Sequence, residues 1–428
     1  MNYKYDLSFA EQLDKEDPLK DFKNEFLIPK HNGKEAIYLC GNSLGLQPRS
    51  AKDYIKRQLD NWENDAVEGW FRGDDPWLNY HKQLVGPLAS IVGAKPTEVS
   101  IMNSLTVNLH LLMVSFYKPT SKRFKILMEA GAFPSDQYAV ESQVKFHGHS
   151  VADAVIEAAP RPGEVTLRTE DILKKIEENS DDLALVLFSG INYYTGQFFD
   201  IEAIAAAAHR AGAYAGFDLA HAAGNVELKL HDWQADFACW CSYKYMNSGP
   251  GGISGIFVNE KHFSDTSLKR FAGWWGYRPD KRFLMAPGFE AADGADGWNV
   301  STAPIILLAL HKASLDIFER VGGMAPLRAK GHALTGYLEY LIDTVNTKLN
   351  EDLYHLITPR DINARGSQLS VVCKRDAKAI FNNLADNGII GDWREPDVIR
   401  LSPVPLYNTY TDVYKAANTL FKAATAVK

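Results

Sequence analysis

The sequence contains few cysteines and no long uninterrupted apolar run, and both features narrow the possible classes of protein. Only four cysteines occur in 428 residues: Cys40, Cys239, Cys241 and Cys373. Four are too few for a disulfide framework in a chain of this length. No second cysteine or histidine pair completes a zinc site, so we expect reduced cysteines and no metal. No stretch approaches the roughly 18 uncharged apolar residues of a transmembrane helix.

The sequence also lacks an excess of basic residues. Its 46 lysines and arginines are outnumbered by 53 acids, giving a net charge of −7. Nucleic-acid-binding proteins usually carry a basic stripe, so no nucleic acid is expected as a partner. The opening residues, MNYKYDLSFAEQLDKEDP, carry acids and lysines throughout, unlike a signal peptide. These absences favour a cytoplasmic enzyme or binding protein that does not bind membranes.

Apolar strand patterns alternate with helical patterns through the middle of the chain. Helices are expected at 104–117, 169–180 and 201–212, with Thr169 as the N-cap of the second. Continuous apolar strands alternating with helices indicate an α/β fold with a mostly parallel sheet covered on both faces. The strands expected in this region are 99–103, 124–130, 183–190, 213–224, 237–243 and 252–258.

The length of the chain predicts more than one domain. We expect an N-terminal segment, 1–69, that packs with the small domain and the active site, and a large domain over 70–304. Residues 305–428 are expected to form a linking helix and a smaller α/β domain. Its predicted elements are helices near 325–350, at 376–388 and from about 409, and strands at 367–373 and within 389–401.

Polar and reactive residues gather just after the predicted strands of the large domain. In an open α/β sheet, ligands bind beyond the carboxyl ends of the strands. Hydroxyls, acids, a histidine and a lysine at these positions therefore predict a binding site. The segments are SLT (104–106), AFPSD (132–136), SGINYYTG (189–196), DLAH (218–221) and SYK (242–244).

Lys244 is the hardest of these residues to explain as structural. It follows an apolar run, and a buried unpaired ammonium is costly. A covalent bond to pyridoxal 5'-phosphate (PLP) would remove that cost, and PLP also needs an acid beside its pyridine nitrogen. Asp218 stands 26 residues before Lys244 and also follows a strand. A helix N-terminus at Leu105 and Thr106 could bind the phosphate together with Tyr243, and Phe133 could stack on the ring.

Each of these residues also has a structural alternative. Asp218 could cap a turn, His221 could be a hydrogen-bonded core residue, and Phe133 could serve packing alone. Ser104 and Thr106 open a helix, where N-caps occur in any case. The glycine run SGPGGISGIF (248–257) suggests a dinucleotide site, but it precedes a strand and lacks the GxGxxG order. A turn between two strands explains it better.

Several longer motifs point to one family. They are LCGNSLGLQP (39–48), MNSLTVNLHLLM (102–113), FPSDQYAVESQ (133–143), LFSGINYYTGQ (187–197), the stretch 217–245 ending in CWCSYKY, GGISGIF (251–257) and IRLSPVPLYN (399–408). With these motifs the sequence resembles the kynureninases, which are PLP-dependent enzymes of fold type I. The resemblance implies the aspartate-aminotransferase-like fold and a homodimer whose active sites lie at the subunit interface.

The resemblance also assigns roles to individual residues. Lys244 is implied to hold PLP, Asp218 to pair with the pyridine nitrogen, and Phe133 to stack on the ring. Arg400 is implied to bind the substrate carboxylate, and Asn42 and Ser43 are implied to bind the substrate as well. Where Thr302 stands, some family members have asparagine, which leaves its contact open. The remaining cofactor contacts implied are Asp136, Ser189 and His221 for orientation, Leu105, Thr106 and Tyr243 for the phosphate, and Trp274 and Thr302 from the partner subunit.

The implied activity is hydrolysis of L-kynurenine to anthranilate and L-alanine by Cβ–Cγ cleavage, a reaction of tryptophan catabolism and NAD biosynthesis. Lys244 would move the Cα proton, and Tyr243 is the candidate proton donor. Family members that favour 3-hydroxykynurenine carry a histidine where Trp70 stands in AVEGWFRGDDPW (66–77). Trp70 therefore predicts a preference for kynurenine, unless it only anchors a loop.

Other functions are compatible with part of the pattern. A cysteine desulfurase of the same fold needs a mobile nucleophilic cysteine, whereas Cys373 lies in SQLSVVCK, which alternates like a strand. A small-molecule aminotransferase would need a keto acid. A non-catalytic protein of this fold should lack the lysine or carry a DNA-binding appendage, and neither applies to the sequence.

Overall fold

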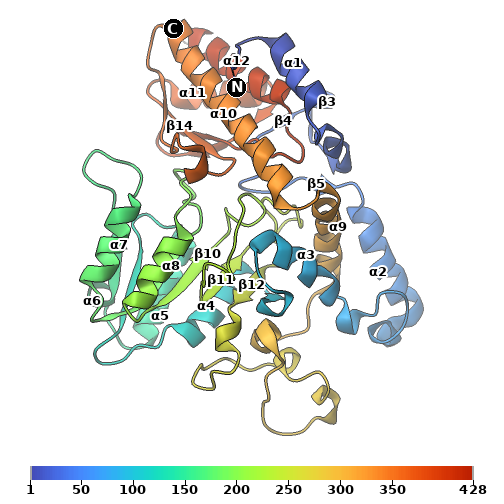
Figure 1. The fold of residues 1–428 in the computed structure, drawn as a ribbon. Coiled ribbons are helices and arrows are strands. Elements are labelled where there is room, and N and C mark those ends of the chain that lie inside the picture. The colour runs from blue at the N-terminus through green and yellow to red at the C-terminus, as the bar shows by residue number, and fades with distance from the viewer. Residues whose placement is uncertain (1, 427–428) are drawn as a thin grey trace.

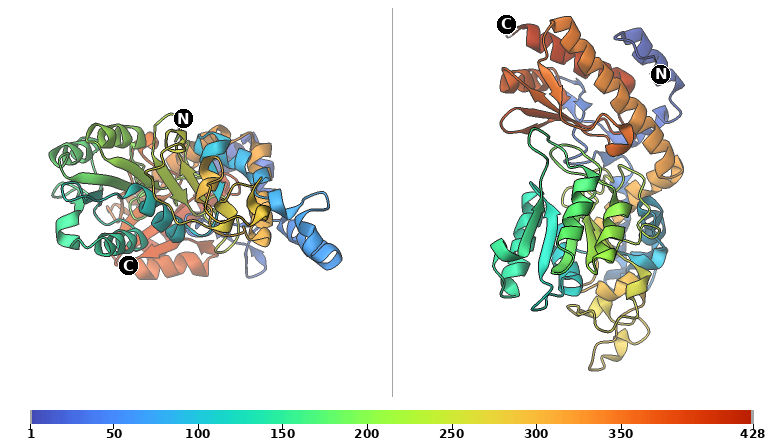
Figure 2. Two further views of the ribbon diagram at one scale, coloured as in Figure 1. Left: turned by 90° about the horizontal axis from the view of Figure 1, so that it is seen from below. Right: turned by 60° about the vertical axis from the view of Figure 1, so that its left-hand side comes forward.

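The computed structural model describes residues 2–426, which form two stacked α/β units (Figure 1). The upper unit contains both the first and the last helix, α1 (Leu7–Glu16) and α12 (Tyr410–Ala426), and these two helices contact each other. The lower unit is built around one large sheet (Figures 1 and 2). The division into 1–69, 70–304 and 305–428 stays a prediction.

The large sheet has seven strands in the order β6-β12-β11-β10-β9-β7-β8. Of the seven strands, β12 alone runs in the opposite direction to the other six, so the expected mostly parallel sheet is confirmed. Strands buried on both faces need apolar residues at every position, which explains the continuous apolar runs. The strands are β6 (Val99–Ile101), β7 (Lys125–Glu129), β8 (Val155–Ala158), β9 (Leu183–Ser189), β10 (Tyr214–Asp218), β11 (Phe237–Trp240) and β12 (Gly255–Val258).

Helices cover both faces of this sheet, and alternate residues of each strand contact opposite layers (Figure 2). In β7, Ile126 and Met128 pack with α4 (Leu105–Phe116) and α5 (Pro134–Phe146). Leu127 joins the cluster on the other face. The helices that contribute to that second cluster include α3 (Lys82–Val92), α7 (Thr169–Glu178), α8 (Ile201–Arg210) and α9 (Ile305–Val321).

Some element boundaries differ from the sequence-based expectation. Strand β11 ends at Trp240 instead of Tyr243, so Lys244 lies in a loop, and β12 starts at Gly255. Thr169 is the first helical residue of α7, and the N-cap is Arg168. The short elements α6 (Val151–Ala154) and β8 were not expected, since four residues are too few to show a period.

The upper unit contains an antiparallel sheet in the order β13-β14-β17-β16. Its strands are β13 (Tyr354–Leu356), β14 (Leu369–Cys373), β16 (Asp392–Arg394) and β17 (Val398–Leu401), packed with α10 (Met324–Leu349) and α11 (Ala377–Asp386). The N-terminal segment joins this unit, where β4 (Ile37–Tyr38) pairs with β15 (Ile389–Ile390). The α-helix not yet named is α2 (Ala51–Asp65). The strands not yet named form two short antiparallel pairs, β1 (Phe26–Leu27) with β5 (Gln47–Pro48) and β2 (Lys30–His31) with β3 (Lys34–Glu35).

The four cysteines are free thiols. Among residues 2–426, no group of three or more histidine, cysteine or acidic side chains is arranged to hold a metal ion. None of the helices in the described part of the chain combines the length and the apolarity that crossing a bilayer requires.

Candidate active site

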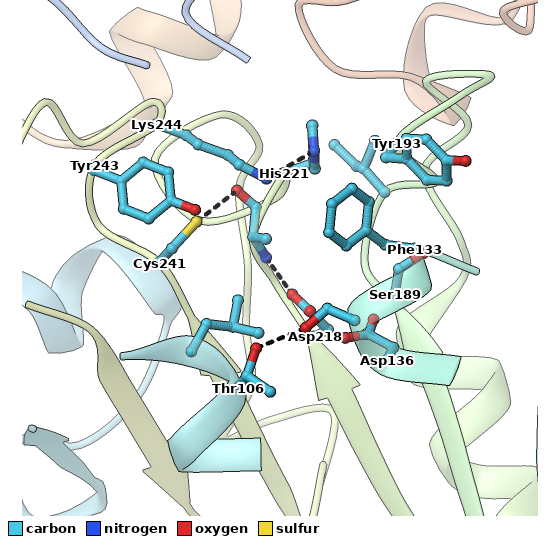
Figure 3. A pocket seen from close by; sticks show the side chains of 14 residues that line it. Thr106, Phe133, Asp136, Ser189, Tyr193, Asp218, His221, Cys241, Tyr243 and Lys244 are labelled. Carbon is cyan, nitrogen blue, oxygen red and sulfur yellow. Dashed lines mark hydrogen bonds between the residues drawn. The ribbon is translucent and has the colours of Figure 1, made fainter. Parts of the chain in front are cut away.

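A cavity of about 180 Å³ opens at the carboxyl ends of the central strands (Figure 3). Every cofactor-binding residue that was expected from the same chain lines it. Those residues are Leu105, Thr106, Phe133, Asp136, Ser189, Asp218, His221, Tyr243 and Lys244. Four further lining residues belong to the segments named from the sequence but were given no role, and the fifth was expected in the core; they are Ser135, Ile191, Tyr193 and Ala220, and Cys241.

The strand register brings the acidic side of the cavity together. Ser189 ends β9 and is paired with Asp218, the last residue of β10. Glu129 ends the next strand, β7. Because neighbouring parallel strands point the same way, their last residues form one row at the edge of the sheet.

Three buried carboxyl groups lie in or behind this row. Asp218 Oδ1 accepts a hydrogen bond from the Ala220 backbone N–H at 2.7 Å, and the carboxyl group of Asp136 lies close enough to interact with that of Asp218. Glu129 accepts from the backbone N–H of Ser189 at 3.0 Å and from its hydroxyl. Burial raises the pKa of all three acids, and repulsion by Asp218 raises that of Asp136 further. Glu129 was missed, although a charged residue ending the run ILME was a usable signal.

Lys244 reaches the cavity from the loop after β11. Its Nζ lies 2.9 Å from Nε2 of His221 and 5.8 Å from the ring centre of Phe133. An ammonium can only donate, so Nε2 of His221 accepts and its proton is on Nδ1, which has no protein partner. Burial and the Lys244 charge hold the pKa of His221 well below its usual value. Lys244 itself is only partly buried, which corrects the expectation of a buried lysine.

The opposite side of the cavity is suited to an anion. Helix α4 begins at Leu105, and the side chain of its N-cap, Ser104, makes no capping bond. The Thr106 and Ser135 hydroxyls are hydrogen-bonded at 2.7 Å beside this helix start. A helix N-terminus with nearby hydroxyls favours a phosphate.

Tyr243 and Cys241 form another wall of the cavity (Figure 3). Burial raises the pKa of Tyr243, and the neighbouring Cys241 adds to the effect, so the phenol keeps its proton. Cys241 was expected in a strand and in the core. It is buried, but it lies beyond the end of β11 and lines the cavity.

The N-terminal segment encloses the lysine loop. The Gly45 backbone N–H donates to the Tyr243 carbonyl at 2.8 Å, and a Cβ on Gly45 would overlap the Lys244 carbonyl oxygen. A Cβ on Gly41 would overlap Tyr407 of the motif VPLYN. Glycine is therefore required in LCGNSLGLQP by two close approaches of the backbone.

Two of the residues implied for substrate binding lie in the upper unit and its attached segment. Arg400 of β17 is buried, donates to the Tyr193 carbonyl and forms an ion pair with Asp392. Buried Asn42 donates to Gln368 at 3.0 Å, and Gln368 donates to the same Tyr193 carbonyl at 3.0 Å. Arg400 thus reaches the cavity wall through Tyr193, whose ring contacts Phe133 edge-on (Figure 3). Ser43 is exposed beside this network.

Trp70, Trp274 and Thr302 do not line the cavity of their own chain. Trp70 packs edge-on against Trp77, with ring centres 5.6 Å apart, and tilted against Trp275 at 6.0 Å. Trp274 is 45% exposed, and Thr302 is exposed as well. The contact of Trp274 and Thr302 with a partner's cofactor, and of Trp70 with substrate, stay predictions.

The donor set fits PLP. Two of the buried acids, Asp218 and Asp136, line the cavity with a single amine, and Asp136 Oδ1 has no hydrogen-bond partner among residues 2–426, so an additional cation such as a pyridinium suits this end. The α4 N-terminus suits the phosphate. Phe133 is 44% exposed and leaves a ring face open for stacking.

The sequence is similar to many curated proteins over nearly its whole length. It is 53% identical to the kynureninase of Flavobacterium psychrophilum over 422 residues, covering 99% of each chain. It is 53% identical to that of Myxococcus xanthus, covering 96% of each chain, and 48% identical to that of Nematostella vectensis, covering 97% of this chain and 94% of that one. The family model for the kynureninase C-terminal domain matches residues 327–420.

Solved structures share the fold at low sequence identity. A cysteine desulfurase from Thermococcus onnurineus superposes with a TM-score of 0.74 at 17% identity, covering 97% of this chain and 98% of that chain. A variant of the cystine C–S lyase C-DES, with glycine covalently linked to its PLP cofactor, gives 0.73 at 15% identity, covering 90% and 96%. These likenesses establish the fold type I architecture.

Proposed function

The chain belongs to the kynureninase family, and from this membership we propose that it hydrolyses L-kynurenine to anthranilate and L-alanine with PLP. The observation that carries the proposal is the cavity in which Lys244, Asp218 and the α4 N-terminus meet. These three features correspond to the three parts of the cofactor that a protein must hold.

Each residue of the cavity has a separate role in the proposed reaction. When bound, PLP supplies an electron sink for the bonds to the substrate's α- and β-carbons. Asp218 would hold the proton on the pyridine nitrogen, and Phe133 would cover the ring. Lys244 would hold the cofactor and, as a free amine, would remove the Cα proton of the substrate. His221, which is uncharged at neutral pH, accepts a hydrogen bond from Lys244 and limits its orientations.

Two further groups act on the substrate. Tyr243 keeps its proton because burial raises its pKa, and it delivers that proton to the carbonyl oxygen or the β-carbon. Arg400 binds the α-carboxylate and so fixes which Cα bond is activated. The water that adds to the γ-carbonyl supplies the new carboxyl oxygen of anthranilate.

The decisive assay is the fluorescence of anthranilate released from L-kynurenine in the absence of a keto acid, with L-alanine as the second product. An aminotransferase would release no anthranilate under these conditions. The desulfurase alternative is disfavoured by Cys373, which is buried in β14 and whose pKa burial raises to about 11. Sulfur release from cysteine without kynurenine cleavage would contradict the proposal.

We also infer a cytoplasmic homodimer that acts in tryptophan catabolism or NAD biosynthesis. In such a dimer, Trp274 and Thr302 of one subunit would complete the cofactor site of the other. Support comes from their exposure and from their absence from the cavity of their own chain.

Arg400→Lys is expected to raise KM for kynurenine at least tenfold, although the charge is kept. Lysine cannot reproduce the planar two-pronged contact of a guanidinium with a carboxylate. The comparison is competitive inhibition by a decarboxylated kynurenine analogue, which should be unaffected. Equal weakening of both compounds would mean that Arg400 serves folding instead.

Trp70→His is expected to shift substrate choice towards 3-hydroxykynurenine. A site with no partner for the ring hydroxyl leaves it unsatisfied, at about 1–3 kcal/mol, or roughly 5- to 150-fold in kcat/KM. The indole offers a single donor, whereas a histidine is smaller and can donate or accept. The measurement is the ratio of kcat/KM for the two substrates in both proteins. A ratio that the substitution leaves unmoved would assign Trp70 only to the aromatic cluster with Trp77 and Trp275.

A further inference from the structure

Within residues 2–426, the one acidic side chain that pairs with Arg400 also pairs with a second arginine. In the β16–β17 pair, Asp392 lies directly opposite Arg400, and Arg394 is two residues further along β16, on the same face as Asp392. Asp392 Oδ2 accepts from Nη2 of Arg400 and, at 3.3 Å, from Nη2 of Arg394. The side chains are 1%, 13% and 37% exposed for Arg400, Asp392 and Arg394, so the Arg400–Asp392 pair is largely shielded from water while Arg394 is partly solvated.

The cluster carries one uncompensated positive charge. Two guanidinium groups meet one carboxylate, and the Nε of each arginine is buried without a partner in the part of the chain that the structure describes. The neighbouring Cys40 and Tyr245 do not neutralise it, because burial raises the pKa of Cys40 to about 12 and raises that of Tyr245 as well. A partly buried cation with unused donors attracts an anion.

The positive charge of the cluster formed by Arg394, Asp392 and Arg400 acts electrostatically on the cavity. Arg400 donates to the carbonyl of Tyr193, a residue that lines the cavity beside Phe133 (Figure 3). Both Arg400 and Arg394 contribute to lowering the pKa of His221, after burial and Lys244. The two arginines therefore act on the same space as the proposed substrate site.

We propose that Arg394 is a positioning residue for the substrate carboxylate: by sharing Asp392, it leaves Arg400 with charge and donors for that group. The inference deepens the proposed function and rests on it. With Arg400 and Asp392 alone, the pair is neutral, and an entering carboxylate would place two anions beside one cation. With Arg394 present, the substrate completes a set of two cations and two anions.

The test is Arg394→Gln in the PLP-loaded enzyme, with L-alanine and ethylamine as probes. L-Alanine carries the α-carboxylate and ethylamine lacks it. Binding is followed by the change in cofactor absorption. We expect the dissociation constant of L-alanine to rise about tenfold, because the loss of one partly screened charge near the site weakens anion binding by about this factor. The dissociation constant of ethylamine should change less than about twofold. KM for kynurenine should rise in parallel, with kcat within about twofold.

Two further variants separate charge from structure. Arg394→Lys keeps the charge and should bind L-alanine close to the parent. Arg375→Gln removes an arginine that pairs with Glu351 and Asp376 elsewhere in the upper unit. It should leave the dissociation constants of both probes unchanged. Unchanged L-alanine binding in Arg394→Gln, or equal weakening of both probes, would overturn the inference. A parent enzyme that binds L-alanine but releases no anthranilate would overturn the proposed reaction while leaving this test intact.

Discussion

Lys244→Ala is expected to abolish kynurenine cleavage, with a loss of at least about 10³-fold in kcat. The substitution removes both the covalent attachment of the cofactor and the amine that moves the Cα proton. The first effect is measured by borohydride treatment and mass spectrometry, which should no longer find cofactor fixed to the chain. The second is measured by anthranilate fluorescence at saturating PLP.

The matched control is Lys229→Ala, which removes an exposed lysine of the same domain and should leave activity unchanged. Circular dichroism should show that both variants are folded, because Lys244 lies in a loop and, within residues 2–426, its side chain makes a single hydrogen bond, to His221. Turnover near the parent rate in Lys244→Ala would refute the assignment of the cavity as a PLP site.

Asp218→Asn is expected to lower kcat about 10²- to 10³-fold while PLP remains bound and fixable by borohydride. The amide is nearly isosteric with the carboxylate, so the cavity keeps its shape. It carries no charge, however, and cannot hold the proton on the pyridine nitrogen. The expected signature is a large change in kcat and in the absorption spectrum of the enzyme, with a smaller change in KM.

Asp232→Asn provides the comparison for this second variant, because Asp232 is an exposed acid in the segment between Asp218 and Lys244. It should behave like the parent enzyme. A normal kcat in Asp218→Asn would remove this residue from the role, and another acid of the cluster would then have to be tested.

The sequence predicted the position of the site because the chemistry is concentrated at strand ends. Asp218 and Ser189 end apolar strands, and parallel strands bring such ends together whatever the rest of the fold does. Cys241 was misplaced because FACWCSY is apolar throughout, whereas β11 ends at Trp240. The contact between Gly45 and the Tyr243 carbonyl holds the following loop, and a contact over such a sequence distance leaves no local signal.

The acidic neighbours illustrate the same limit. Glu129 sits at a strand end, but only the strand order shows that it lies behind Ser189. Arg394 and Asp392 belong to a short strand whose register with β17 decides that they meet Arg400. The register between two strands depends on long-range packing. Ion pairs between side chains of neighbouring strands therefore could not be predicted from the sequence.

The buried acid cluster has a consequence for how much of the protein a cell maintains. The folded-state pKa values of Glu129, Asp136 and Asp218 are raised, so these groups favour folding at low pH. That contribution is lost as the pH rises from about 4, the unfolded value, through their folded-state values. At neutral pH the cofactor-free chain therefore carries the cost of burying these acids, and repulsion by Asp218 adds to that cost at Glu129 and Asp136.

A pyridinium placed beside Asp218 would offset that cost, and because the cavity exists only in the folded chain, PLP bound there would stabilise the fold in proportion to the logarithm of its free concentration. Chains made when PLP is scarce would therefore spend more time unfolded and would be degraded faster. The supply of PLP would thus set the lifetime of the protein as well as the fraction that is active.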